Sequence, residues 1–290
     1  MDGLSRILPL VSLLVTLTIW ASVPTVAKAA LAHVSLVTYL MLRYTLAGLF
    51  MLPYLKQTMA GAARLSWRSW TVLVVSSCMI IYVQTWAIQQ VTASWYIIVF
   101  SSCPVLIALL LRYRFTLRAV AGLLATIGGL ALYLQDSHAS GTPFQLGALL
   151  GVLAGMLSWV AYTVVVTRFH AVYNDTQITA ICSYIGALFS LALFLAADDY
   201  SVQQANWQVA AAIVVSGTLM PLSLWCYSYS MRKAEALTIF GQYLEPLIGL
   251  FIAFLVFGAE LTAVACAAVA LILGGTVAVT RYSVKPASRH

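Results

Sequence analysis

The chain has 290 residues, of which 62% are hydrophobic and only 8% are charged, with a mean hydropathy of +0.96 and a formal net charge of +7. A soluble domain carries about 25% charged residues, so this composition excludes a water-soluble globule and predicts a polytopic membrane protein. A helix needs about 20 apolar residues to cross a bilayer, so ten spans would fill most of the chain and leave no room for a soluble domain.

Ten apolar segments follow one another and are joined by short loops. In chain order we expect membrane-spanning helices at 7–27, 35–55, 70–89, 92–111, 117–135, 146–167, 178–197, 207–230, 236–257 and 262–280. The first segment follows Arg6 and precedes Ala27-Lys28-Ala29, a pattern that also occurs in cleaved signal peptides. We expect it to be retained as a span, because its apolar run continues past Trp20 and has a counterpart later in the chain.

The basic residues predict the orientation, because lysine and arginine concentrate on the cytoplasmic side of membrane proteins. With the N-terminus in the cytoplasm, every basic residue except Lys28 and Arg43 falls on the cytoplasmic side. This arrangement predicts that both termini are cytoplasmic and that the chain lies in the plasma (inner) membrane. Glu235, beside Arg232 and Lys233, is expected to form a charge pair within a cytoplasmic loop.

The five cysteines all lie within apolar segments and show no CxxC spacing; they are Cys78, Cys103, Cys182, Cys226 and Cys266. Single cysteines inside a membrane are usually packing residues, so we expect no disulfide. The four histidines lie near loops or ends, and no cluster has metal-ligand spacing. We therefore expect no metal and no cofactor, and the chain has no motif for binding nucleic acid.

Similar features recur about 140 positions apart, which indicates an internal repeat. Trp20 corresponds to Trp159, and Pro104 corresponds to Pro246. Likewise, 47–50 corresponds to 187–189, and Gly128-Gly129 corresponds to Gly274-Gly275. Each half contains five predicted spans, and an odd number of spans gives the two halves opposite orientations. The expected fold is an all-α polytopic membrane protein with ten transmembrane helices in two inverted repeats of five, over 1–138 and 139–290.

The ordered set of motifs resembles the drug/metabolite transporter superfamily in its EamA-type branch. In the first half the likeness rests on Trp20-Ala21-Ser22, Leu42-Arg43-Tyr44, Ala47-Gly48 and the stretch from Ala87 to Pro104, and in the second on Leu244-Glu245-Pro246, Gly258-Ala259-Glu260 and Gly274-Gly275. Ala259 separates the glycine and glutamate that are adjacent in many relatives. The resemblance implies a ten-helix carrier with a central cavity, most similar to exporters of amino acids, including aromatic ones.

The candidate site lies where polar and aromatic residues occur at mid-depth. Glu245 is about nine residues into its span, hence about 14 Å deep, and a carboxylate at such depth is a functional candidate. It is followed by a proline, which removes a backbone donor. The expected substrate-binding residues are Trp20, Tyr82, Trp86, Ser102, Pro104, Trp159, Tyr162, Gln242, Glu245 and Pro246, and no residue is expected to be catalytic.

Each of these residues also has a structural interpretation. Glu245 would then join the two halves, the two prolines would only bend the bundle, and Trp86 would lie at the headgroups as part of an aromatic belt. Arg43 is expected to make a structural ion pair or to cap carbonyls, or to reach Glu245.

Taken together, these features predict a secondary transporter that exports small metabolites, most readily amino acids, by alternating access through an aromatic-lined cavity. The alternatives are a helper or flippase for lipid-linked substrates, or an exporter of nucleosides or drugs. An enzyme is not expected, since only Glu245 is a deep carboxylate and no histidine joins it. The expected partners are a small-molecule substrate and the lipid bilayer, and both a monomer and a homodimer remain open.

Overall fold

The structure is a computed structural model that describes residues 2–59, 64–90, 100, 103–136, 146–197, 200–202, 206–257 and 262–285. Nearly all of these residues are helical. Its helices are α1 (Asp2–Leu31), α2 (Leu36–Phe50), α3 (Leu55–Met59), α4 (Trp67–Met79), α5 (Thr85–Gln90), α7 (Cys103–Leu110), α8 (Leu117–Asp136), α9 (Leu146–Phe169), α10 (Asp175–Ala196), α11 (Trp207–Lys233), α12 (Glu235–Gly241), α13 (Glu245–Phe257) and α14 (Ala263–Tyr282).

Helix is found in each of the ten predicted segments. Most of 92–102 lies outside the described residues, so the fourth segment is seen mainly as α7. Helix α10 begins at Asp175, three residues before the predicted start. The side chains of Asn174 and Gln177 each accept a hydrogen bond of 2.9 Å from the other's backbone N–H and close a capping box. Such a box supplies partners for backbone donors that a helix start leaves free.

Within the described residues, three of the predicted spans are interrupted. A bend of 54° separates α2 from the helical stretch Leu52–Thr58. A π-helical turn, Ile80–Gln84, joins α4 to α5, and a 3₁₀ turn, Gln242–Leu244, joins α12 to α13. Turns of these kinds inside longer helices often mark functional positions.

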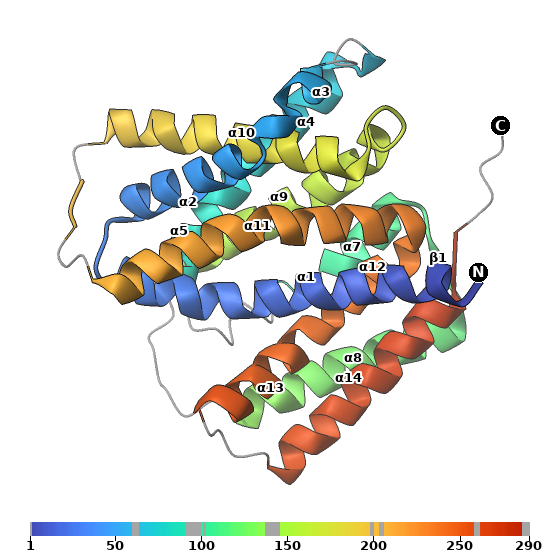
Figure 1. The fold of residues 1–290 in the computed structure, drawn as a ribbon. Coiled ribbons are helices and arrows are strands. Elements are labelled where there is room, and N and C mark those ends of the chain that lie inside the picture. Colours follow the sequence, from blue (N-terminus) through green and yellow to red (C-terminus); the bar gives the residue numbers. More distant parts are fainter. Residues whose placement is uncertain are drawn as a thin grey trace.

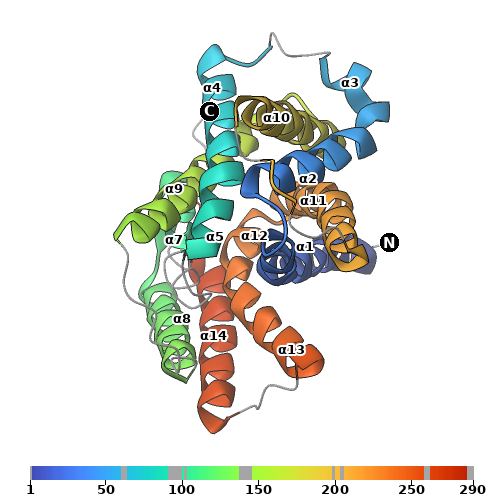
Figure 2. The same ribbon diagram turned by 90° about the vertical axis from the view of Figure 1, so that its left-hand side faces the viewer.

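Helix pairs pack closely where a glycine removes a side chain. The two glycine pairs matched in the sequence provide an example, since Gly129 and Gly275 lie in the contact between α8 and α14. A Cβ added at Gly129 would come within 2.9 Å of the Ala268 carbonyl oxygen. Figures 1 and 2 show these two helices side by side, and α1 likewise lies along α11.

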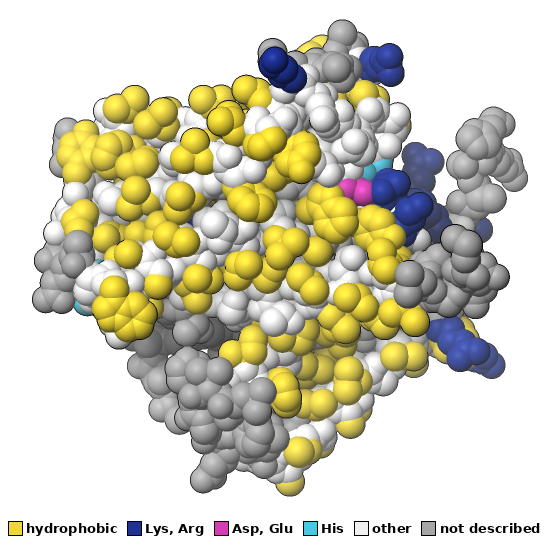
Figure 3. Space-filling view, viewed as in Figure 1, with side chains coloured by type: hydrophobic (Ala, Val, Ile, Leu, Met, Phe, Trp, Pro, Cys, Tyr) yellow, Lys and Arg dark blue, Asp and Glu magenta, His cyan; other side chains and the backbone are white. Residues whose placement is uncertain are grey.

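The bundle surface is suited to a bilayer. Four helical segments are long and apolar enough to cross a membrane: Trp67–Ala87, Leu146–Phe169, Asp175–Ala196 and Trp207–Lys233. The bent pair beginning at Leu36 would make a fifth within the part of the chain that the structure describes. In Figure 3 hydrophobic side chains cover most of one face, while the visible lysines and arginines lie at its upper and right-hand edges.

A small sheet departs from the expected all-α fold. Strands β1 (Arg114–Phe115) and β2 (Ser283–Val284) pair antiparallel, with Arg114 opposite Val284. Tyr113, just before β1, and Lys285, just after β2, both contact the Glu235 carboxylate, at 2.8 Å and 2.7 Å. The sheet therefore joins the α7–α8 connection to the C-terminal segment and to the start of α12.

Candidate functional site

Four aromatic side chains from three helices meet inside the bundle. Trp20 of α1 lies edge-on to Trp159 of α9, with ring centroids 4.9 Å apart. Tyr162, one turn along α9, stacks on Trp159 at 5.2 Å. Tyr227 of α11 contacts both tryptophans, at 5.1 Å and 5.3 Å. We call Trp20, Trp159, Tyr162 and Tyr227 the aromatic cluster.

The polar atoms of the aromatic cluster all have partners. The Trp159 indole N–H donates to Gln242 Oε1 at 3.0 Å, and the Trp20 indole N–H donates to Ser223 Oγ at 3.2 Å. The Tyr227 hydroxyl pairs with Thr163 Oγ1 at 3.1 Å. These hydrogen bonds fix the orientation of each ring, because a buried indole or phenol needs a partner for its polar end.

The structure brings together Trp20 and Trp159, which correspond in the sequence, and it adds Tyr227, which sequence reasoning missed. The available signal was its position on α11, one turn beyond Ser223 and therefore on the same helix face. Hydropathy alone gave no reason to prefer this tyrosine to the other aromatic residues of the chain.

Glu245 lies at the helix break that follows Gln242, the residue that accepts the Trp159 indole N–H. Gln242 begins the 3₁₀ turn, and Glu245 is the first residue of α13. The Glu245 side chain is partly buried, and within the described residues no hydrogen bond or ion pair to it is found. The Cys103 thiol lies close enough to interact with this carboxyl electrostatically.

Both prolines matched in the sequence are buried. Pro246 is the second residue of α13, and Pro104 lies in α7. A proline in the first turn costs no hydrogen bond, because backbone N–H groups there have no partner within the helix. Pro246 therefore begins α13 after the break, rather than disrupting a continuous helix.

The remaining predicted residues lie apart from the aromatic cluster or outside the described chain. Ser102 is not among the described residues. Tyr82 is 37% exposed in the π-helical turn. Trp86 packs against α9 at Gly151, where an added Cβ would come within 2.6 Å of its ring. Within the described chain, no ring contact joins Tyr82 or Trp86 to Trp159.

Arg43 is buried in α2 and does not reach Glu245. Its guanidinium donates to the Tyr39 hydroxyl at 3.4 Å and to Met220 Sδ at 3.3 Å. No carboxylate lies within ion-pairing distance of it in the described residues. The expected ion pair is therefore replaced by neutral partners and by the rings of Tyr39 and Tyr44, whose centroids are 5.8 Å and 5.4 Å from the guanidinium carbon.

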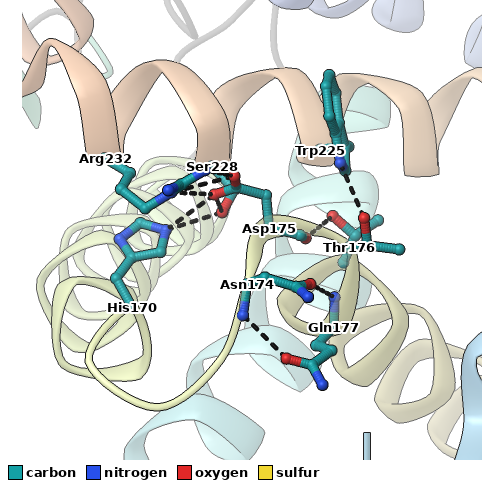
Figure 4. Close-up of polar contacts among 9 residues, drawn as sticks. His170, Asn174, Asp175, Thr176, Gln177, Trp225, Ser228 and Arg232 are labelled. Atoms are coloured by element: carbon teal, nitrogen blue, oxygen red, sulfur yellow. Dashed lines mark hydrogen bonds and ion pairs between the residues drawn. The ribbon is translucent and has the colours of Figure 1, made fainter. Parts of the chain in front are cut away.

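A second polar group, shown in Figure 4, was missed by sequence reasoning. Asp175 is 4% exposed and accepts hydrogen bonds from Ser228 Oγ, at 3.0 Å, and from Arg232. His170 Nε2 lies 2.8 Å from the same serine oxygen. Burial lowers the pKa of His170 and outweighs the opposite effect of Asp175. These contacts tie the α9–α10 connection to the end of α11.

The expected charge pair of Glu235 with its neighbours in the sequence is wrong. Arg232 pairs with Asp175, whereas Glu235 pairs with Lys285 at 2.7 Å. The physical reason is that α11 continues to Lys233 and α12 starts at Glu235. Arg232 and Glu235 therefore lie on two successive helices rather than in a loop, and their side chains point to different partners.

A helical bundle with an apolar exterior, internal helix breaks and a buried aromatic and polar centre has the features of a multi-pass membrane transporter. The comparisons with known proteins agree. The EamA-like transporter family matches residues 7–135 and again residues 145–281, and the chain belongs to this family. It is therefore a transporter and not an enzyme.

One protein sequence and one solved structure resemble the chain over most of its length. A protein of Archaeoglobus fulgidus described as an uncharacterized transporter is 23% identical over 254 residues, covering 83% of this chain and 86% of that protein. One crystal structure has a similar fold, with a TM-score of 0.73 at 19% identity, over 93% of this chain and 96% of that one. At that identity the likeness concerns the fold alone.

Proposed function

We propose that this transporter exports small amphipathic metabolites that carry an amine and a planar or apolar group, amino acids with aromatic side chains foremost. The observation that carries the proposal is the position of the aromatic cluster next to the helix break at Gln242 and Glu245. Aromatic faces attract planar groups and cations. The Glu245 carboxyl has no ion-pair partner among the described residues and is suited to a substrate ammonium group.

The proposed architecture is ten spans in two inverted repeats, over 1–138 and 139–290. It is supported by where repeat-related residues lie. Trp20 contacts Trp159, and a Cβ added at Gly48 would lie 3.1 Å from that of Ala187. Helices α8 and α14, which end the two halves, also pack together. Equivalent residues meet in this way only when they lie near the twofold axis that relates the halves.

The proposed mechanism is alternating access, in which the two halves rock about a central cavity that contains the aromatic cluster. We place the chain in the plasma (inner) membrane with both termini in the cytoplasm. This orientation is supported by the arginines and lysines near the ends of α11, α14 and β2 and in the α7–α8 connection.

The experiment is counterflow in proteoliposomes loaded with single unlabelled compounds. The panel comprises tryptophan, phenylalanine, leucine, lysine, a nucleoside, a planar cationic drug and a lipid-linked sugar. Each compound is supplied outside in labelled form against its own unlabelled load, and the aromatic amino acids are expected to exchange best. Counterflow with only the nucleoside or the drug would replace the proposed substrate, and movement of only the lipid-linked compound would make the chain a flippase. Trp159→Ala proteoliposomes of equal protein content serve as the control for binding at the cluster.

A further inference from the structure

Arg43 carries a positive charge in the interior of a membrane bundle without an acidic partner among the described residues. It is 4% exposed, and its Nε has no hydrogen-bond partner in the described part of the chain. Its guanidinium donates to two neutral groups, the Tyr39 hydroxyl at 3.4 Å and Met220 Sδ at 3.3 Å, and lies near the rings of Tyr39 and Tyr44. An arginine inside a bilayer is costly, so a residue kept there is a candidate for a specific role.

The contacts of Arg43 lead to the aromatic cluster. Met220 lies on α11, where the Ser223 hydroxyl donates to the Met220 carbonyl oxygen at 2.8 Å and lies 3.7 Å from the Met220 sulfur. The same Ser223 Oγ accepts the indole N–H of Trp20 at 3.2 Å. Ser223 therefore connects the residue that Arg43 binds to the ring that contacts Trp159.

The backbone of α11 favours this connection. Pro221 lies inside the helix, between Met220 and Ser223. Because proline has no N–H, it leaves a gap in the backbone hydrogen bonds one turn before it, at Gly217. Gly217 also lets α2 approach, since a Cβ there would come within 2.9 Å of the Arg43 carbonyl oxygen. The part of α11 that contains Ser223, the hydrogen-bond partner of Trp20, therefore lacks one backbone hydrogen bond and packs closely against α2.

We propose that Arg43 is a positioning residue for substrate selection. Acting through Met220 and Ser223, it fixes the indole of Trp20 in the aromatic cluster and so sets the aromatic surface offered to a planar side chain. The selection part rests on the proposed function above, whereas the positioning part concerns the protein alone. The expected consequence is that loss of the Arg43 contacts releases Trp20 and weakens binding of large planar side chains more than that of small aliphatic ones.

The test of positioning uses no substrate. The full chain is labelled with 5-fluorotryptophan and placed in lipid nanodiscs, and the ¹⁹F resonance of Trp20 is identified as the one missing from Trp20→Phe. Arg43→Met and Ser223→Ala are expected to shift and broaden this resonance. The double variant is expected to match Ser223→Ala alone, because contacts in one chain do not add independently.

The matched control is Arg68→Met. Arg68 is exposed, with its guanidinium carbon 5.8 Å from the ring centroid of Trp67, so its loss should leave the Trp20 resonance unchanged. An unchanged Trp20 resonance in Arg43→Met, or additive shifts in the double variant, would overturn the positioning role. If Arg43 had a purely structural role, Arg43→Met would lower the melting temperature, but its effect on the Trp20 resonance would be independent of Ser223→Ala.

Two further variants keep the test decisive if Arg43→Met is not folded. Met220→Leu keeps the volume but removes the sulfur that Arg43 contacts, and Arg43→Lys keeps the charge but loses the planar fork. Both should move the Trp20 resonance, and a folded Met220→Leu protein with the normal resonance would contradict the proposal.

Selection is measured as the ratio of the binding constants for tryptophan and leucine. We expect Arg43→Met to lower that ratio about fivefold, the loss that corresponds to one net hydrogen bond. An unchanged ratio in a folded variant would refute the selection part. If the unmodified protein binds no amino acid, the proposed function fails, and the fluorine experiment still decides whether Arg43 positions Trp20.

Discussion

Replacement of Glu245 by glutamine tests whether the carboxylate at the helix break binds a substrate amine. Glutamine keeps the volume and most hydrogen-bonding capacity but removes the charge. Among the described residues Glu245 has no ion pair that the change would break. Any large loss of ligand affinity would therefore reflect the lost contact between the carboxylate and the ligand, and the stability of the folded protein should change little.

The expected size follows from elementary electrostatics. An ammonium about 4 Å from a carboxylate gains about 4 kcal/mol at an effective dielectric constant near 20. Much of this gain offsets desolvation, so a net value of about 1.5–3 kcal/mol, typical of hydrogen bonds to charged groups, is the better guide. We therefore expect Glu245→Gln to weaken binding of phenylalanine roughly 10- to 150-fold.

The assay is equilibrium binding of labelled phenylalanine to purified protein in nanodiscs, with melting temperature measured in parallel. Glu235→Gln is the matched control, because Glu235 is also the first residue of a helix but pairs with Lys285. That control should bind phenylalanine normally. A folded Glu245→Gln protein with unchanged affinity would refute the reasoning, and substrate would then be held without an ionic anchor. Loss of yield for both Glu245→Gln and Glu245→Ala would instead indicate a structural carboxylate.

Three further predictions follow from the packing, the polar group at Asp175 and the charge distribution. Gly275→Leu should lower the melting temperature in detergent, because a Cβ at Gly275 would already come within 2.5 Å of a carbonyl oxygen of α8; an unchanged melting temperature would contradict the close α8–α14 contact. The pKa of His170 is lowered by burial in the folded state. Its contribution to stability is therefore fully present above the ordinary histidine pKa and is lost as pH falls from that value through the lowered pKa of the folded state. His170→Asn should flatten this acid-side decline of the melting temperature, and an identical pH profile would refute the assignment. If both termini are cytoplasmic, Ser137→Cys in a cysteine-free background should react with an impermeant thiol reagent from outside intact cells, and Arg64→Cys should not. The reverse pattern would overturn the orientation.

Much of the chain's organisation could be predicted from the sequence, because it depends on local composition and on repeated spacing. Long apolar segments can be satisfied in a bilayer only as helices, which pair their own backbone groups, and helix is present in each predicted segment that the structure describes. The spacing in the sequence matched Trp20 with Trp159, and the centroids of these two rings lie 4.9 Å apart. Polar side chains that cap helices act over three or four residues, so a start such as that at Asn174 is also encoded locally.

The partners of the polar side chains were decided only by the tertiary structure. Arg43 donates a hydrogen bond to Met220, and Asp175 pairs with Arg232, although both partners are distant in the sequence. Each partner depends on how a helix is rotated about its axis, and these helices are apolar on nearly every face. Hydropathy therefore fixes where such a helix starts and ends, but not which face meets a neighbour. Glycines at close contacts, together with breaks such as the one before Glu245, set that rotation, and their effect appears only when the helices are packed together.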